Sequence, residues 1–187
     1  DKEPLLAEQR DVIEATHAYI GWHIQTRAEQ GKSSGSVKRD ELKKVLRECL
    51  ADDDDGQRLA DELFTAYTSR VLCLVERDKD WFQFDVQSLR EFFTATYIFD
   101  EGKRDARDDY FTAMLRRPYW SNVCRFYVGK YSPAEVRDIR HILQELSKEH
   151  PLGLHPMLRS TAALFLNDRT YERQKPAPIQ EVVDFIL

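Results

Sequence analysis

Apolar positions recur along the first part of the chain with the spacing of an amphipathic α-helix. In residues 4–30 they return every seventh position, which places them in one stripe and predicts a long helix with a single buried face. The members of this stripe are Leu5, Leu6, Val12, Ile13, Tyr19 and Ile20. Glycine and serine dominate residues 31–36, where we expect a flexible connector. This stretch lacks the spacing of a phosphate-binding loop and follows a helix rather than a strand.

Two further helices are predicted before residue 71. Residues 37–50 are amphipathic, and Ser36 stands before them as an expected N-cap. The acidic residues 52–55 are expected to open the next helix, which ends near Arg70, because negative charge complements the positive end of the helix dipole. A calcium loop is disfavoured, because the run lacks the alternating oxygen ligands and the distal glutamate of an EF-hand.

The only strand pattern lies in residues 71–85, where two stretches of β-forming residues flank a short polar turn at residues 78–80. In the second stretch the alternation places Phe82 and Phe84 on one face and Trp81 on the other. A two-stranded hairpin is marginal in water by itself, so we expect it to lie on helices. Three helices, a hairpin and a further helix follow one another in the order of a winged helix.

An aromatic helix is predicted at residues 86–99. It is apolar around most of its circumference, so we expect it to be buried on more than one side. Either Asp85 caps it, or Ser88 does so through the S-x-x-E spacing that it makes with Glu91. The charged residues 100–109 are expected to form a loop between two parts of the molecule.

Helices are predicted again beyond this loop. Ser132 is an expected N-cap, and apolar residues follow it at helical spacing. These residues are Val136, Ile139, Leu143 and Leu146. The predicted fold is therefore mainly α. A winged-helix-like domain covers residues 1–99, with its hairpin at 71–85 and its joint helix at 86–99, and an antiparallel helical array covers residues 100–187, truncated at its C-terminus.

Composition and charge narrow the range of partners. With 42% hydrophobic and 33% charged residues, the chain has the makeup of a soluble protein with a sizeable core. Its net charge of -5 opposes binding to nucleic acid and to anionic membranes. The candidate recognition helix, residues 52–70, carries six acidic residues against two arginines, so nucleic acid is not an expected partner. No apolar run approaches the about 18 residues of a membrane span, and we expect a cytoplasmic protein.

No catalytic motif emerges, and the chain is not expected to be an enzyme. The histidines have neither cysteine partners nor the HExxH spacing, and each is expected to be a surface or satisfied core residue. Cys49, Cys73 and Cys124 are expected to be buried, reduced thiols, because they are odd in number and lack CxxC spacing. The chain starts at Asp1 without a methionine, and we expect it to be a piece of a longer protein.

One motif resembles a known family. NACHT-type STAND NTPases, the signal-transducing ATPases of animal and bacterial immunity, have the stretch F-x-H-x-S-F-Q-E-Y/F-F-A-A after a hairpin, and residues 84–95 are similar to it. The matching residues are Phe84, Ser88, Glu91, Phe92, Phe93 and Ala95. Residues 36–50 and 60–84 fit the same register upstream. Downstream, the chain resembles the W-x-x-V-x-x-F-x-x-G that opens the family's second helical domain, at Trp120, Val123, Phe126 and Gly129.

The resemblance implies a regulatory, non-catalytic region of such an NTPase. In the family, ADP holds the winged helix against the nucleotide-binding domain, and exchange for ATP releases it and permits oligomerisation. The implied partners are the parent's own nucleotide-binding domain and further copies of the parent. ATP or ADP with Mg²⁺ would bind mainly outside this chain, because the Walker A and B elements lie elsewhere; no cofactor is expected within it.

Two positions depart from the family pattern. Val86 stands where the family has a histidine that is expected to touch the nucleotide phosphate, so the resemblance implies a degenerate nucleotide-contacting position there. Arg90 stands where the family has a glutamine. Valine has no polar atom in its side chain, so only the backbone at this position can approach a phosphate.

The strand-to-helix joint is the candidate functional region, since it would couple the nucleotide-reading module to a helical arm. The residues expected to pack in this joint are Trp81, Phe82, Phe84, Ser88, Leu89, Glu91, Phe92 and Phe93. Two other interpretations stay open. The chain could be a helical scaffold that binds partner proteins, or, less favoured, a winged-helix module that binds DNA.

Overall fold

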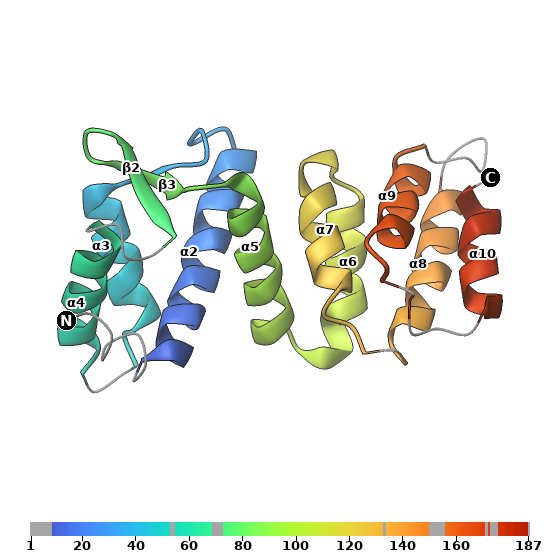
Figure 1. Ribbon diagram of the computed structural model, residues 1–187, viewed down its shortest axis with the longest axis horizontal. Coiled ribbons are helices and arrows are strands. Elements are labelled where there is room, and N and C mark those ends of the chain that lie inside the picture. The colour runs from blue at the N-terminus through green and yellow to red at the C-terminus, as the bar shows by residue number, and fades with distance from the viewer. Residues whose placement is uncertain are drawn as a thin grey trace. The chain divides into compact units, whose positions relative to one another are not determined.

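A computed structural model shows a mainly helical protein with a small three-stranded antiparallel sheet (Figure 1). It describes residues 9–52, 55–68, 73–132, 134–149, 156–170, 172 and 176–186. The chain forms two compact units, Asp1–Tyr97 and Ile98–Leu187. Among the described helices, none combines the length and the apolar character that crossing a membrane requires.

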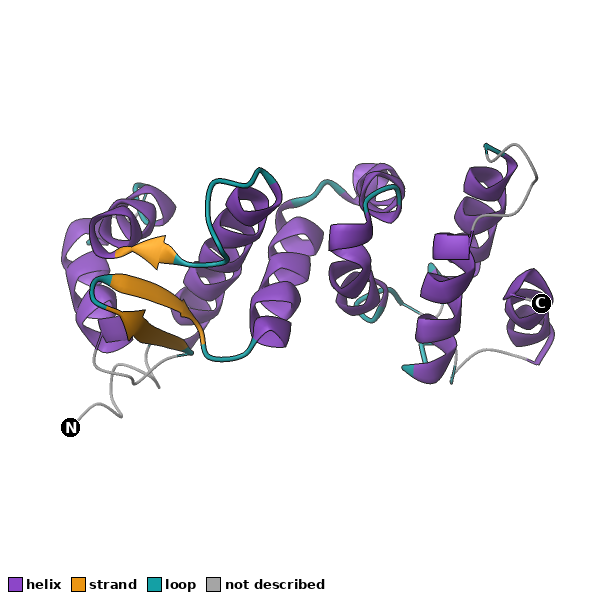
Figure 2. Cartoon of the chain, turned by 90° about the horizontal axis from the view of Figure 1, so that it is seen from above, coloured by secondary structure: helices purple, strands orange, loops and turns teal. Residues whose placement is uncertain are grey.

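The first unit contains α2 (Arg10–Glu29), α3 (Arg39–Cys49), α4 (Gly56–Thr68) and the greater part of α5 (Gln87–Glu101). Within this unit α2 lies between α3 and α5 (Figures 1 and 2). A Cβ atom added at Gly21 of α2 would lie 3.0 Å from the Cβ atom of Phe93 and 3.1 Å from the carbonyl oxygen of Arg90. Glycine at this position therefore allows α5 to approach α2 closely.

The buried face of α2 is more polar than its sequence pattern predicts. Of the expected apolar stripe, Ile20 is buried, Val12, Ile13 and Tyr19 are partly buried, and Leu5 and Leu6 lie outside the described residues. The buried residues of α2 are Thr16, His17, Ala18, Ile20, Gly21, Ile24 and Gln25. Seven-residue spacing drifts around an α-helix of 3.6 residues per turn, so the stripe and the buried face coincide only over part of the helix.

Gly31 ends α2. It has φ of +68°, and its N–H group donates to the carbonyl of Ala28 at 3.0 Å. The N–H group of Lys32 donates to the carbonyl of Arg27 at 2.9 Å. This pair of hydrogen bonds is the Schellman motif, which favours glycine because the left-handed conformation is strained for residues with a Cβ atom.

The sheet has three strands, in the order β1 (Val37–Lys38), β3 (Trp81–Phe84) and β2 (Leu74–Asp78) (Figure 2). The predicted hairpin is confirmed as β2 and β3, but it gains a third strand that was not predicted, and the prediction of a helix beginning at residue 37 after a Ser36 cap is wrong. Val37 pairs with Phe82 and is 2% exposed, and α3 begins only at Arg39, behind the extended Lys38. A two-residue strand is too short to produce a periodic pattern in the sequence.

The hydrophobic core of the first unit is built mainly from α3, α4 and the sheet. Its buried residues are Ile20, Ile24, Val37, Leu42, Val45, Leu46, Leu50, Leu59, Ala60, Leu63, Tyr67, Leu74, Phe82 and Phe84. Two residues of α5, Leu89 and Phe93, pack against this core and are themselves only partly buried.

At the start of α4, the backbone carbonyl of Asp55 accepts a hydrogen bond from the N–H group of Leu59 at 3.0 Å. Asp55, the last residue of the acidic run that was expected to open the helix, thus lies directly before α4. Residues 53–54 of that run lie outside the described part.

The charged stretch expected to be a loop at residues 100–109 is largely helical. The helix α5 continues to Glu101, a 3₁₀ turn covers Arg104–Ala106, and α6 (Arg107–Leu115) follows at once. Acidic and basic side chains do not interrupt a helix, and α5 stops where Gly102 follows, since glycine has a low helix propensity. The expected loop is thereby reduced to a short connection.

The second unit continues with a 3₁₀ turn (Pro118–Trp120), α7 (Ser121–Val128), α8 (Val136–Lys148), α9 (Pro156–Asn167) and α10 (Pro176–Ile186) (Figure 1). The predicted buried face of α8 is confirmed: Val136, Ile139, Leu143 and Leu146 are all at most 5% exposed. Before α8, the N–H group of Ser132 donates to Glu135 Oε2 at 2.8 Å, and the N–H group of Glu135 donates to Ser132 Oγ at 3.4 Å. These reciprocal bonds have the pattern of a capping box, but α8 begins at Val136, so its N-cap position is Glu135 and not the predicted Ser132.

Candidate functional site

The strand β3 leads into the joint and alternates as its sequence predicts. Phe82 and Phe84 are 0% and 3% exposed, whereas Trp81 and Gln83 on the opposite face are half-buried. The ammonium group of Lys38 lies 5.2 Å from the centre of the Trp81 ring, a cation–π contact between β1 and β3. The buried phenylalanines therefore fix which face of the strand meets the helices.

Arg39, the first residue of α3, holds the turn of the hairpin. The backbone N–H group of Arg39 donates to the carbonyl of Asp80 at 2.9 Å. In its side chain, Nε donates to Asp80 Oδ1 at 2.7 Å and Nη2 donates to Glu76 Oε1 at 3.2 Å. Asp80 has φ of +65°, and its own N–H group donates to Glu76 Oε1 at 2.8 Å. One guanidinium therefore ties the start of α3 to both sides of the turn, and the planar fork of arginine suits this arrangement.

The joint between β3 and α5 is a two-residue turn. The N–H group of Asp85 donates to the carbonyl of Cys73 at 3.0 Å, and the carbonyl of Val86 accepts from the N–H group of Leu89 at 3.1 Å. The helix begins at Gln87, so neither Asp85 nor Ser88 is its N-cap, and both capping predictions are wrong. Val86 is 49% exposed. Its side chain thus faces solvent within the described structure, directly before the first turn of α5.

The residues of α5 that were expected to pack in the joint divide into two groups. Leu89 and Phe93 pack on the core, and Glu91 is buried and accepts a hydrogen bond from Gln87 Nε2 at 2.8 Å. Ser88 is exposed, and Phe92 is 37% exposed with its ring edge-on to that of Phe93 at 5.3 Å. Ser88 and Phe92 are therefore the exposed members of this set on α5.

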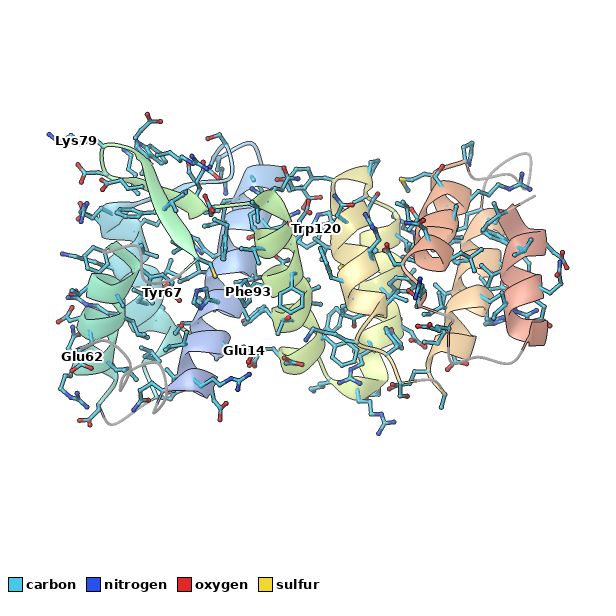
Figure 3. All side chains as sticks on the ribbon, viewed as in Figure 1. Glu14, Glu62, Tyr67, Lys79, Phe93 and Trp120 are labelled. Carbon is cyan, nitrogen blue, oxygen red and sulfur yellow. The ribbon has the colours of Figure 1, made fainter. Side chains whose placement is uncertain are left out.

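His17 lies at the centre of the joint, which the sequence did not reveal. It is 3% exposed, and its ring stacks on Phe93 of α5 with the ring centroids 4.9 Å apart. Tyr67 of α4 and Phe84 of β3 face the same ring, with centroids at 5.0 Å and 6.4 Å. Figure 3 shows where Tyr67 and Phe93 lie in the first unit. Burial lowers the pKa of His17, against the opposing influence of the Ile13 carbonyl and Glu14. A histidine surrounded by aromatic rings has no short-range sequence signal, because these rings come from three separate elements, all distant from α2 in the sequence.

Arg90 forms a second buried contact between α5 and α2. It is 8% exposed, and its Nε donates to Gln25 Oε1 at 2.9 Å. Gly35 has φ of +89°, and a Cβ atom added there would lie 2.1 Å from Arg90 Nη1. The Arg90 guanidinium therefore lies directly against Gly35, in the connector of residues 31–36.

Charged side chains on the exposed surface of α4 are paired with one another and with α3. Arg58 pairs with Asp55 at 3.1 Å and with Glu62 at 2.7 Å, and Asp61 pairs with Arg47 at 3.4 Å. Arg58 of α4 thus forms ion pairs with two acidic neighbours. Arg70 lies outside the described residues.

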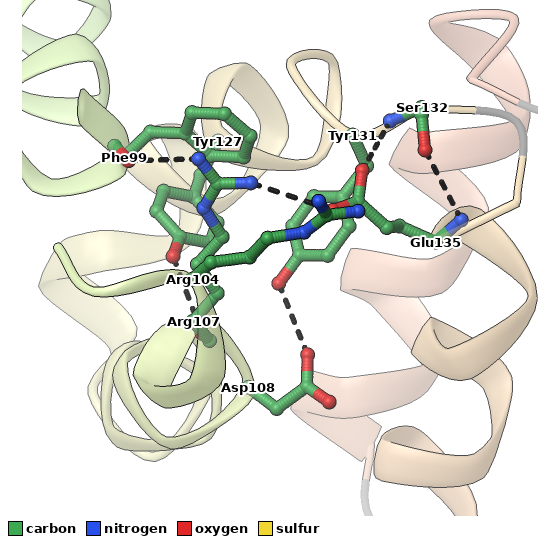
Figure 4. A network of polar contacts seen from close by, with 8 residues as sticks. All are labelled: Phe99, Arg104, Arg107, Asp108, Tyr127, Tyr131, Ser132 and Glu135. Carbon is green, nitrogen blue, oxygen red and sulfur yellow. Dashed lines mark hydrogen bonds and ion pairs between the residues drawn. The ribbon is translucent and has the colours of Figure 1, made fainter.

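The second unit contains a polar cluster at the end of α5 (Figure 4). The Arg107 guanidinium lies 3.7 Å from the centre of the Phe99 ring and pairs with Glu135 at 3.4 Å. Tyr127 donates to the carbonyl of Arg107 at 3.2 Å. Hydrogen bonds from Ser132, together with the charges of Arg104 and Arg107, hold the pKa of Glu135 below its ordinary value. The contacts of this cluster link α6, α7 and the segment before α8 to Phe99, and so contribute to the packing of the second unit.

No described group of residues has the composition of a metal site. All three cysteines are free thiols, but only Cys124 is buried, and Cys49 and Cys73 are partly exposed, so the expectation of burial holds for one of the three. A shallow hollow beside α3 is lined by Asp40, Lys43, Lys44, Arg47, Glu48 and Ala51. Five of these are charged residues of α3, and Ala51 lies two residues beyond its end.

In the described residues, the joint is built by the packing of α2, α4, β3 and α5 around His17. Its buried groups are aromatic rings and polar side chains, of which His17 Nε2 and Gln25 Nε2 have no hydrogen-bond partner among the described residues, and its exposed group at the helix start is Val86. Comparison with protein-family models, with curated proteins and with solved structures found no match for this chain.

Proposed function

We propose that this chain is the regulatory, non-catalytic region of a NACHT-type STAND NTPase, comprising its winged helix and the start of its second helical domain. The order α2, β1, α3, α4, β2 and β3 supports the winged-helix assignment, because in that fold a short strand follows the first helix and a hairpin follows the third. The helix α5 then runs from the first unit into the second. Such a helix suits the transfer of a movement from one unit to the other.

The observation that carries the proposal is the position of Val86. It lies directly before α5, in the motif that resembles the family, and 49% of it is exposed. The free N–H groups of a first helical turn and the positive end of the helix dipole attract phosphate without a side chain. In the parent, this helix start would face the ADP phosphates in the closed state, held less firmly than by a histidine.

The proposed switch depends on different affinities of its two states for nucleotide. A ligand moves a population from 1:99 to 99:1 only if it binds one state about 5.5 kcal/mol more tightly than the other. ADP would favour the state in which the first unit lies on the nucleotide-binding domain, and ATP would favour the released state that oligomerises. The catalytic elements and the Mg²⁺ belong to other parts of the parent.

The proposal is tested by the rate of ADP release from the full-length parent. Val86→His should add a hydrogen bond to a charged group, worth about 1.5–3 kcal/mol, and so slow ADP release by roughly ten- to a hundredfold. Ser88→His is the matched control, because Ser88 is also exposed in the first turn of α5 but points elsewhere around the helix. Equal release rates for the wild type and Val86→His would show that this position does not face the nucleotide.

A scaffold that binds partner proteins is the rival function, and one observation favours it. Phe92 is 37% exposed on α5, and Tyr110 and Tyr119 are 41% and 40% exposed in the second unit. Large exposed aromatic side chains are enriched at protein interfaces. If the chain is only such a scaffold, its parent carries no Walker A sequence, and Phe92→Asp weakens partner binding without any effect on nucleotide release.

A further inference from the structure

His17 is held in one tautomer by its surroundings. Its Nδ1 lies 2.7 Å from the carbonyl oxygen of Ile13, which can only accept a hydrogen bond, so Nδ1 carries the proton. Tyr67 and Thr16 complete the polar contacts, with the Tyr67 hydroxyl 3.1 Å from His17 Nδ1 and 3.2 Å from Thr16 Oγ1. The other ring nitrogen, Nε2, is buried and has no hydrogen-bond partner among the described residues.

Protonation of His17 would place both a charge and an unsatisfied donor in this site. The new proton must go to Nε2, because Nδ1 already carries one, and no described acceptor lies within reach. The titratable groups that face the ring are Glu14 of its own helix and the Tyr67 hydroxyl of α4, whereas β3 and α5 face it with Phe84 and Phe93. Burial raises the pKa of Tyr67, so this hydroxyl stays neutral and cannot compensate the charge.

The element that can yield to this charge is α5. The helix α4 is anchored by Leu59, Ala60, Leu63 and Tyr67, all at most 5% exposed, whereas α5 meets the core through the partly buried Leu89 and Phe93. Further contacts of α5 with α2 include the polar pair of Arg90 and Gln25 and the packing of Tyr97 on Tyr19 and Trp22. Local opening occurs first where few buried apolar contacts resist it.

We propose that His17 is a proton-sensitive latch, whose protonation releases Phe93 and with it the part of α5 in the first unit. Opening the latch exposes Nε2 to water, where the imidazolium is fully solvated. This device depends only on the first unit and not on the nucleotide-linked function proposed above. It makes the mobility of α5 a function of pH in the range where histidine titrates.

The sign and size of the effect follow from linkage. Burial lowers the pKa of His17 in the closed form below the ordinary 6.5, so protons bind the open form better and opening increases as the pH falls. With a pKa of 6.5 in the open form, the opening equilibrium at pH 5.5 should exceed that at neutral pH by up to about tenfold. The gain continues at lower pH until the closed form is itself protonated.

The test combines two measurements on the chain as it stands. Histidine ring NMR should show the pKa of His17 below its ordinary 6.5, and hydrogen exchange should show protection of the α5 amides of residues 90–97 falling by up to about tenfold between pH 7.5 and 5.5, after correction for intrinsic exchange. Amides of α3 and α4 should lose less protection. An ordinary pKa for His17, or an equal loss of protection in α3, α4 and α5, overturns the proposal.

Variants assign the effect to the one residue. His17→Phe keeps a ring against Phe93 but cannot bind a proton, and it should make α5 protection independent of pH over this range. His141→Gln, which removes an exposed histidine of α8, should leave the pH dependence unchanged. If His17→Phe does not fold, the wild-type NMR titration and the comparison of α5 with α3 and α4 still decide the matter.

Discussion

The imidazole of His17 stacks on the phenyl ring of Phe93, with ring centroids 4.9 Å apart and an angle of 27° between the planes. This contact joins α2 to α5 at the point where Gly21 allows the two helices to approach each other. The two neighbouring aromatic residues of α5 differ in burial: Phe93 packs against the core, whereas Phe92 is 37% exposed.

Phe93→Ala should therefore destabilise the chain far more than Phe92→Ala. Removing the partly buried Phe93 ring leaves a cavity beside His17 and Phe84, and we expect a loss of about 3 kcal/mol. Phe92→Ala should cost about 1 kcal/mol or less, since most surface substitutions have small effects. Urea unfolding of both variants measures the difference. Similar midpoints would mean that the core does not depend on the Phe93 ring.

Gly35→Ala should be more damaging than Gly31→Ala, although both glycines have positive φ. At Gly31, with φ of +68°, an added Cβ atom meets nothing within 4 Å, so only the left-handed conformation is penalised, by about 1 kcal/mol. At Gly35 the Cβ atom would also displace the Arg90 guanidinium from Gln25, and we expect a total of about 3 kcal/mol.

A double-mutant cycle isolates the Arg90 contribution to this cost. In an Arg90→Ala background the excess penalty of Gly35→Ala over Gly31→Ala should disappear, because no guanidinium remains to be displaced. An undiminished excess would place the cost in the backbone of the connector instead. Chemical denaturation of the four variants supplies the necessary free energies of unfolding.

Arg39→Lys should loosen the hairpin turn without unfolding α3. A lysine keeps the positive charge but cannot donate at once to Asp80 and Glu76 in the geometry of a guanidinium. Faster hydrogen exchange is expected at the amide of Asp80, which donates to Glu76. Arg47→Lys, on the same helix with an exposed ion pair to Asp61, serves as the control and should leave the turn unchanged.

Glu135→Gln should reduce stability in a pH-dependent manner. The pKa of Glu135 lies below its ordinary 4.5 in the folded chain, so its stabilising contribution is present above pH 4.5 and is lost as the pH falls through the folded pKa. The variant should be less stable than the wild type at pH 7, and the difference should shrink below pH 4.5. Glu101→Gln, which removes an exposed carboxylate, is the control. A difference that does not vary with pH would exclude an ionised Glu135 as its source.

Local patterns in the sequence determined the elements with strong periodicity. The alternation of Phe82 and Phe84 predicted the buried face of β3, and the spacing from Val136 to Leu146 predicted that of α8. The reciprocal hydrogen bonds between Ser132 and Glu135 could also be predicted in part from the sequence, because the two residues are three positions apart. Such features depend on residues within one or two turns of one another, so the chain itself contains the whole signal.

Only the tertiary structure decided the features that depend on distant segments. β1 exists because Val37 finds the free edge of β3 at Phe82, and the aromatic surroundings of His17 come from residues 50 to 76 positions further along the chain. The exposure of Phe92 and the burial of Arg90 likewise follow from which side of α5 meets α2. A helix that is apolar around most of its circumference does not specify its buried side, because burial is fixed by the surface against which it packs.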